Sequence, residues 1–221
     1  MQVILDAMPQ LLKALLGTIE FSVVGIILAI IIGLITAFFK LSRFIVLRAV
    51  ANVYIELFRC TPLFIQIMFI YFGLANVLPL NHWFGDSYVW VAAAASLALN
   101  EGSYMSEIIR GGIVSIDRGQ KEAGHSIGMT GFQTMVHIVL PQAFKRMIPP
   151  LVNQSAQTIK DTSLLAIVGI GELIYNGQII VSNTFKAFDI YGAIGLLYFI
   201  IIFPLTRAAA LLERRLQVDK R

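Results

Sequence analysis

Two acidic side chains, Glu101 and Asp161, stand in stretches of the chain that are mostly apolar or uncharged. A carboxylate in a low-dielectric interior costs several kcal/mol when it has no partner, so its presence calls for a cation. That cation is either a ligand or a basic side chain of the same chain. Lys160 adjoins Asp161, but successive residues of a helix do not face each other, so this pair is poor unless the helix breaks there. We therefore predict that both carboxylates line a ligand pocket, with internal pairing as the alternative.

Uncharged polar residues share helix faces with these two carboxylates. Residues four apart lie on one face of a helix, and a face with several polar groups cannot meet lipid, so it indicates an internal cavity or a subunit interface. Tyr104 either contacts a ligand there or is a buried tyrosine whose hydroxyl is bonded within the protein. The two faces consist of Asn153, Gln157 and Asp161, and of Asn100 and Tyr104 with Glu101 one turn from the tyrosine.

The sequence lacks the residue groupings that catalysis or metal binding needs. The three histidines are far apart, and the single cysteine, Cys60, has no further ligand residues nearby, so we predict no metal site. No Gly-x-x-x-x-Gly-Lys-Ser/Thr phosphate loop occurs, so ATP is not bound here by that motif. A membrane-embedded enzyme that uses Tyr104 and the two carboxylates for acid–base chemistry is an alternative, but no recognisable catalytic motif supports it. We expect a non-catalytic chain without cofactors.

The composition places these residues in a membrane. Of the 221 residues, 57% are hydrophobic and 14% are charged, whereas soluble domains average about 25% charged residues. The net charge is +4 at pH 7, but the basic residues cluster beside hydrophobic stretches, where they set membrane orientation and contact anionic lipid. We therefore predict a membrane-lipid partner and no nucleic acid. An all-α integral membrane protein is the expected fold class.

Hydropathy predicts about five membrane-spanning helices within one domain, residues 1–221, because each span needs about 20 apolar residues. The sequence Arg59-Cys60-Thr61-Pro62 interrupts the second span. Proline lacks a backbone donor and disfavours helix at the preceding residue, so we expect a kink or break near Thr61. The predicted spans are residues 11–39, 50–78, 88–109, 151–173 and 190–212.

Basic residues between the spans predict the orientation of the chain. Cytoplasmic loops carry an excess of Lys and Arg, whereas the connections 79–87 and 176–189 carry at most one basic residue and are expected outside. An odd number of spans then gives an external N-terminus and a cytoplasmic C-terminus. The basic clusters are Lys40, Arg43 and Arg48; Arg118, Lys121, Lys145 and Arg146; and Arg214, Arg215, Lys220 and Arg221.

The long connection of about residues 114–147 is expected to hold two short helices. Asp117 can cap the first helix, and Gly128 and Gly131 bracket a turn, in which Gly128 supplies the positive φ that a side chain penalises. The second helix is expected over residues 132–140, ended by the proline that follows. The turn then presents apolar side chains to a partner, although a simple surface hairpin is the alternative.

Two further acidic residues have a basic residue three positions later, which places both members on one helix face. Glu107 and Arg110 are predicted to pair near the cytoplasmic end of the third span. Glu56 and Arg59 are predicted to form a partly buried pair in the second span, with contact between Arg59 and a substrate carboxylate as the alternative.

The spacing within residues 122–141 resembles the "EAA" loop of the membrane permease subunits of ABC importers. The only departure is Gly124, which stands where the loop has its second alanine. The flanking residues 104–113 and 159–164 resemble the polar amino acid branch of that family, the histidine, glutamine and arginine type. The matching residues of the loop are Glu122, Ala123, Gly128, Ile138, Leu140 and Pro141.

The resemblance implies the type I ABC importer permease fold and a coupling helix that inserts into a cleft on an ATPase subunit. Glu122 would fix the loop through a charge-assisted hydrogen bond to a basic residue of this chain or of the partner. The residues expected to couple to the ATPase are Glu122, Ala123, Gly124, Ile127, Gly128, Met129 and Phe132.

The resemblance also implies a helix break near residues 161–163, where freed backbone groups would bind an amino acid. With two acidic walls, a basic amino acid such as arginine, lysine or histidine is the expected substrate. The residues expected to bind it are Glu101, Asp161, Asn100, Tyr104, Gln157, Thr162 and Ser163.

The resemblance finally implies a complete transporter in the bacterial cytoplasmic membrane. It would combine two permease subunits, an ATPase dimer that holds ATP and Mg, and an external substrate-binding protein. A homodimer is favoured, because one chain carries both carboxylates and the whole loop. The alternative function is an ATP-independent amino acid carrier or channel, in which the intramembrane carboxylates are gating or proton sites.

Overall fold

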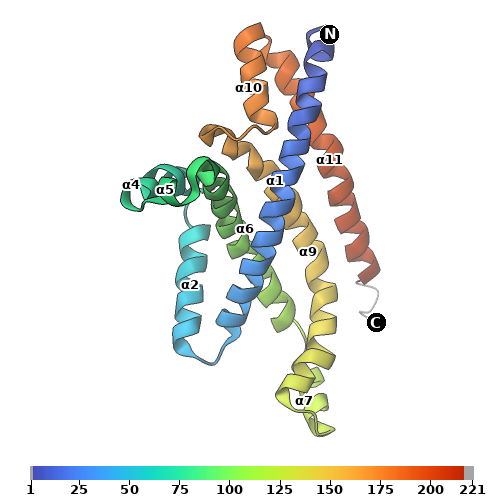
Figure 1. The fold of residues 1–221 in the computed structure, drawn as a ribbon. Coiled ribbons are helices and arrows are strands. Elements are labelled where there is room, and N and C mark those ends of the chain that lie inside the picture. Colours follow the sequence, from blue (N-terminus) through green and yellow to red (C-terminus); the bar gives the residue numbers. More distant parts are fainter. Residues whose placement is uncertain (1, 217–221) are drawn as a thin grey trace.

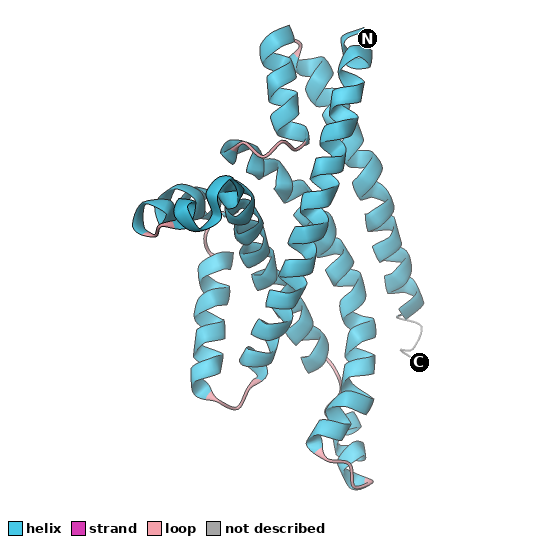
Figure 2. Cartoon of the chain, in the orientation of Figure 1, coloured by secondary structure: helices cyan, strands magenta, loops and turns pink. Residues whose placement is uncertain are grey.

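The structure is a computed structural model that describes residues 2–216, and every regular element in that part of the chain is helical (Figure 2). Lys220 and Arg221, which belong to the predicted cytoplasmic basic cluster, lie outside the described residues. The α-helices are α1 Gln2–Leu41, α2 Ile45–Arg59, α3 Leu63–Met68, α4 Leu74–Val77, α5 Leu80–Phe84, α6 Tyr88–Val114, α7 Arg118–Ser126, α8 Gly131–Thr134, α9 Leu140–Asp161, α10 Leu173–Thr184 and α11 Ala187–Leu216. Two π-helical segments, η1 Phe69–Gly73 and η3 Met135–Val139, and two 3-10 segments, η2 Gly85–Ser87 and η4 Thr162–Val168, join them.

Length and composition identify up to four membrane spans among the described helices. Helices α1 and α11 qualify alone, and two more spans result if each of two bent helix pairs counts as one. Helix α6 has 27 residues, about 40 Å at 1.5 Å per residue, which is long enough to cross but too polar to qualify by composition. The predicted span 88–109 is therefore α6, whose polar residues are buried between α1, α2 and α9.

The break predicted near Thr61 is confirmed. Residues 45–59 and 63–77 meet at an angle of 105°, so α3 and α4 run away from the α2 axis (Figure 1). The Gln66 side-chain amide donates to the carbonyl oxygens of Phe58 at 2.9 Å and Thr61 at 3.0 Å. Asn100 donates to the same Phe58 carbonyl at 3.2 Å. The backbone groups freed by the break are thus satisfied by side chains, as a break at membrane depth requires.

The predicted span 151–173 and the outer connection 176–189 are wrong in their bounds. Helix α9 begins at Leu140 and ends at Asp161. The chain continues as the 3-10 helix η4, which ends where Gly169 adopts a φ of +81°. Helix α10 occupies much of the expected loop because Glu172, completely buried, caps it by accepting from the amides of Ile174 and Tyr175. This buried cap stabilises a helix in a stretch that was predicted largely as a loop.

Helix α1 begins at Gln2 rather than near residue 11 and runs from the end of the molecule that holds the N-terminus to a level above α7 (Figure 1). Its contact with α6 depends on small residues. A Cβ atom added at Gly102 would lie 2.8 Å from Ile32 Cγ2, and one added at Gly33 would lie 3.0 Å from Met105 Cβ. Glycine therefore allows the two backbones to approach closely, which is how helices associate in lipid.

Of the two predicted ion pairs, one is confirmed. Arg110 Nη2 lies 2.9 Å from Glu107 Oε2, and Lys40 of α1 adds a second bond, with Nζ 2.8 Å from Glu107 Oε1. The prediction of a pair between Glu56 and Arg59 is wrong, since no salt bridge joins these two residues in the described part of the chain. Arg59 ends α2 at the break and turns toward α6 instead.

The segment between α6 and α9 lies at the end of the molecule opposite to the N-terminus (Figure 1). The predicted cap is confirmed, because Asp117 Oδ1 accepts from the Gly119 amide at 2.7 Å. The prediction that Pro141 ends the second helix is wrong. The chain passes from α8 through η3 into α9 without a turn. The π-helical segment directly before Pro141 widens the helix where proline interrupts the regular hydrogen-bond ladder.

Candidate functional site

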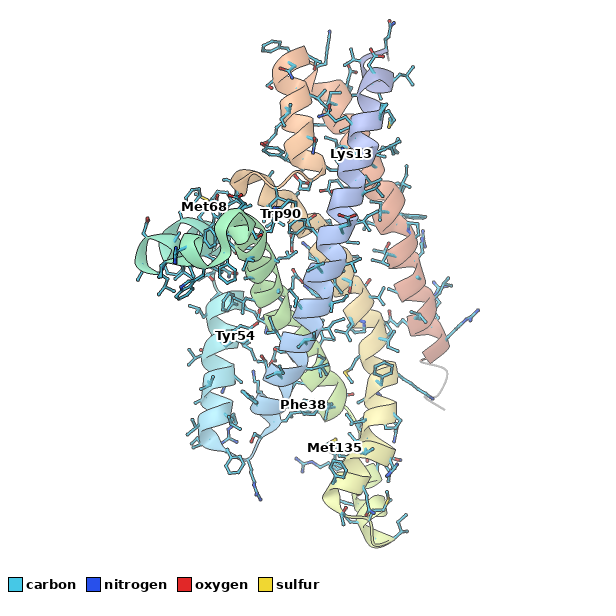
Figure 3. All side chains as sticks on the ribbon, in the orientation of Figure 1. Lys13, Phe38, Tyr54, Met68, Trp90 and Met135 are labelled. Atoms are coloured by element: carbon cyan, nitrogen blue, oxygen red, sulfur yellow. The ribbon has the colours of Figure 1, made fainter. Side chains whose placement is uncertain are left out.

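A polar cavity of about 600 Å³ lies where the broken end of α2 meets α6 and α9. Five of the seven predicted substrate-binding residues line it: Asn100, Glu101, Tyr104, Gln157 and Asp161. The other lining residues are Arg59, Cys60, Thr61, Pro62, Leu63 and Gln154. Tyr54, labelled in Figure 3, ties α2 to α6 beside the cavity by donating to the Leu99 carbonyl at 2.6 Å.

Neutral donors hold the two cavity carboxylates. Glu101 is 1% exposed, and its Oε2 accepts from Gln154 Nε2 at 2.8 Å and Thr158 Oγ1 at 3.0 Å. Asp161 Oδ1 accepts from Gln157 Nε2 at 3.0 Å. Within residues 2–216, no salt bridge to either carboxylate is present, so the Lys160 alternative is not formed.

The Glu101 and Asp161 side chains both line this one cavity. Two carboxylates at short range repel, and the amide and hydroxyl donors around them carry no full positive charge to offset this. A cation placed between them would be attracted by both, which makes this end of the cavity suited to a positively charged group.

Arg59 gives the cavity a positive end. Its guanidinium carbon lies 5.3 Å from the centroid of the Tyr104 ring, a cation–π contact. Arg59 is the one basic side chain among the lining residues that the structure describes. Sequence reasoning assigned Arg59 mainly to a pair with Glu56. The signal that would have placed it here is Pro62, because a helix that stops before this proline ends with Arg59 beside the break.

Three predicted substrate residues have bonds of their own within the protein. Asn100 lines the cavity, but its amide donates to Gln66 Oε1 at 2.9 Å as well as to the α2 end. Thr162 is fully buried and donates to the Ile159 carbonyl at 2.7 Å, and Ser163 donates to the Lys160 carbonyl at 2.6 Å. Thr162 and Ser163 are not among the lining residues, although the helix does change type at Thr162.

A second candidate site is the turn between α7 and α8. Gly128 has the predicted positive φ, +84°, and the turn leaves two large apolar side chains in solvent. Ile127 is 77% exposed and Phe132 is 78% exposed, while Met129 is half-buried. Exposed apolar groups next to each other at a helix turn are typical of a surface that docks to another protein.

The remaining predicted coupling residues lie on α7. Glu122 and Ala123 are exposed, and Gly124 is buried against the following helix. The expected hydrogen bond from Glu122 to a basic residue of this chain is not found among the described residues, where its carbonyl accepts from Ser126 Oγ at 2.9 Å. Glu122 is thus an exposed residue of the same segment as the apolar anchors.

The described residues hold no group of three or more His, Cys, Asp or Glu side chains placed to bind a metal ion.

Comparison with known proteins finds a match along nearly the whole chain. The family model for binding-protein-dependent transport system inner membrane components matches residues 7–218. The chain is 37% identical over 214 residues to the glutamine transport system permease protein of Escherichia coli (strain K12), covering 96% of this chain and 95% of that protein. It is 34% identical over 209 residues to the arginine transport system permease protein of Bacillus subtilis (strain 168), covering 95% and 93%.

Solved structures give the same result. The crystal structure of an amino acid ABC transporter with histidines matches with a TM-score of 0.87 and 31% identity, covering 96% of each chain. An inward-facing methionine ABC transporter matches with a TM-score of 0.76 at 19% identity, covering 96% of this chain and 98% of that chain, a likeness that concerns the fold.

Proposed function

The chain belongs to the family of binding-protein-dependent transport system inner membrane components, and from this premise we propose that it is the translocation subunit of an ATP-driven importer of polar amino acids. The observation that carries the proposal is the polar cavity, which has an acidic end and a basic end between helices of the membrane bundle. The chain is non-catalytic in this proposal. ATP and Mg belong to a partner ATPase.

The charges of the cavity support a basic amino acid as the substrate. Every amino acid has a carboxylate that Arg59 can attract and an ammonium group that a carboxylate can attract. The cavity has two carboxylates, Glu101 and Asp161, which together attract positive charge more strongly than one would, and this favours a substrate with an additional positive group, such as arginine or lysine. Relatives named for glutamine and for arginine match this chain to similar degrees, and the second carboxylate favours the cationic substrate.

The exposed turn supports docking to the ATPase. Ile127 and Phe132 are the anchors of this surface, and the Glu122 carboxylate can pair with a basic residue of the partner. In this arrangement the 114–147 connection and the C-terminus are cytoplasmic and the N-terminus is external, where the substrate-binding protein docks. A second copy of the chain completes the pathway, since one copy carries both the cavity and the turn.

Transport then follows from differential binding to two states of the bundle. Closure of the ATPase dimer moves the docked turns, and these move the helices around the cavity between outward and inward states. The break after Arg59 and the change to η4 after Asp161 are the places where the cavity walls are least constrained by regular helix.

Uptake by reconstituted complexes tests the proposal. Proteoliposomes that contain this chain, the ATPase and the binding protein are supplied with ATP inside and radiolabelled arginine, histidine or glutamine outside. The Glu101→Gln and Asp161→Asn variants are expected to lose arginine uptake at least about tenfold, since each removes one attraction of about 1.4 kcal/mol or more to a desolvated cation. Glu56→Gln, which neutralises a carboxylate outside the cavity, is the matched control. Arginine uptake unchanged in both cavity variants would refute the basic substrate.

The ATP-independent carrier remains the second candidate function, because the cavity itself does not require a motor. Liposomes that contain this chain alone discriminate the two. Robust uptake without the ATPase would overturn the importer, whereas uptake that needs ATP and the partner supports it.

A further inference from the structure

The buried face of α7 packs against α8 and η3, and the two sides approach closely at Gly124. Gly124 is the buried residue of α7, and an ideal Cβ added there would lie 3.0 Å from Thr134 Oγ1, 3.1 Å from Thr134 Cγ2 and 2.9 Å from Ile138 Cδ1. Most Cβ contacts in proteins are longer than these three distances, so the neighbouring atoms would have to move. The threonine side chain therefore fills the space that an alanine methyl group would need.

Thr134 is held in this position although its hydroxyl has no hydrogen-bond partner. The residue is 2% exposed, and its Oγ1 is the one buried side-chain polar atom in the described part of the chain without a partner. A threonine in a helix can donate to the carbonyl four residues earlier, but here that bond is absent. The side chain is placed by its packing against Gly124 instead.

Gly124 and Thr134 also bound the docking turn through their backbones. The Met129 amide donates to the Gly124 carbonyl at 3.1 Å, and the Thr134 amide donates to the Thr130 carbonyl at 2.9 Å. Ile127 and Phe132 lie between these two residues. Met135, labelled in Figure 3, follows Thr134 at the start of η3 beside α7. The distance between the two helices at residues 124 and 134 thus sets how the turn presents its apolar anchors.

We propose that Gly124 and Thr134 are a matched pair of positioning residues, which fixes the separation of α7 from the α8–η3 helix and through it the geometry of the docking turn. The inference rests on the proposed function of that turn. The pairing with Thr134 explains why residue 124 is glycine, although the "EAA" loop has its second alanine at this position. The side chain tolerated at residue 124 depends on the side chain at residue 134.

A set of four variants tests the pair: Gly124→Ala, Thr134→Ala, the double variant, and the control Gly131→Ala. Gly131 lies in the same segment, but a Cβ there meets nothing within 4 Å. Hydrogen–deuterium exchange of the full chain within the complex reports how readily the backbone hydrogen bonds of residues 124–134 open. Radiolabelled arginine and glutamine uptake, together with ATP hydrolysis, measures coupling.

Gly124→Ala is expected to speed amide exchange in this segment and to lower uptake about tenfold. A tenfold loss corresponds to about 1.4 kcal/mol, which is near the lower end of the cost of forcing an extra methyl group into a packed contact. Uptake should fall more than ATP hydrolysis does. The double variant should restore both, because only the flexible end of Ile138 then remains close to the new methyl group. Thr134→Ala alone removes the side chain that packs against Gly124, so it should also speed exchange and lower uptake, whereas Gly131→Ala should stay near the unmodified chain.

Two outcomes separate this inference from the proposed function. If Gly124→Ala behaves like Gly131→Ala, or if the double variant is no better than the single one, the matched pair is wrong. If exchange changes and is rescued while uptake and ATP hydrolysis do not respond, the pair stands as a packing feature, the positioning role is overturned, and the docking function of the turn fails with it.

Discussion

Gly128 offers a prediction whose magnitude follows from one torsion angle. Its φ is +84°, a region where a side chain costs about 1–2 kcal/mol, and nothing lies within 4 Å of an added Cβ. Gly128→Ala therefore carries the backbone cost without a clash. At about 1.4 kcal/mol per factor of ten, the equilibrium constant for forming the turn falls about 5- to 30-fold. If docking needs this turn, uptake falls by up to the same factor.

Asparagine makes the reasoning specific to the backbone, because it adopts the left-handed region more readily than alanine does. Gly128→Asn should therefore retain more uptake than Gly128→Ala, although its side chain is larger. The assay is ATP-dependent uptake by proteoliposomes at matched protein abundance, with Gly131→Ala as the control. Equal uptake in all variants, or less uptake with asparagine than with alanine, would refute the argument from φ.

Three further predictions follow from the contacts. Gln66→Ala leaves the Phe58 and Thr61 carbonyls at the broken helix without their shared donor, so thermal unfolding in detergent should show a loss of about 1–3 kcal/mol, and an unchanged melting temperature would contradict this. Thr134→Val keeps the shape of the side chain but removes its unpartnered hydroxyl, so it should raise stability by about 1 kcal/mol in the same assay, where a decrease would be the contrary result. Phe132→Ser should weaken ATPase binding by about tenfold or more in a pull-down titration while leaving the melting temperature unchanged, and undiminished binding would count against docking at this surface.

Features that depend on local chemistry were predictable from the sequence. The break before Pro62, the positive φ of Gly128 and the cap at Asp117 each follow from the backbone preferences of one or two residues. The two carboxylates were also identifiable, since a buried charge is costly wherever the chain folds.

Features that depend on distant contacts were not predictable. Gln66 is 34 residues from Asn100, and nothing in the local pattern indicates that their amides meet at the end of α2. The buried cap of α10 was not predicted, because the sequence placed Glu172 at the end of the span 151–173 and nothing local indicated that a new helix begins after it. Pro141 misled in the opposite direction, because a π-helical segment lets the helix continue through a residue that usually ends it.

The length of α1 has a mechanical consequence. Forty residues make a rod of about 60 Å, twice the thickness of the hydrocarbon layer, so its two ends lie on opposite sides of the bilayer or beyond. The N-terminal end of α1 packs with α10 and α11. Its C-terminal end is joined to α6 by the salt bridge between Lys40 and Glu107 (Figure 1). A tilt of about 10° moves one end by about 10 Å relative to the other. One continuous helix is thus long enough to join the two faces of the membrane, so a tilt at one face is also a displacement at the other.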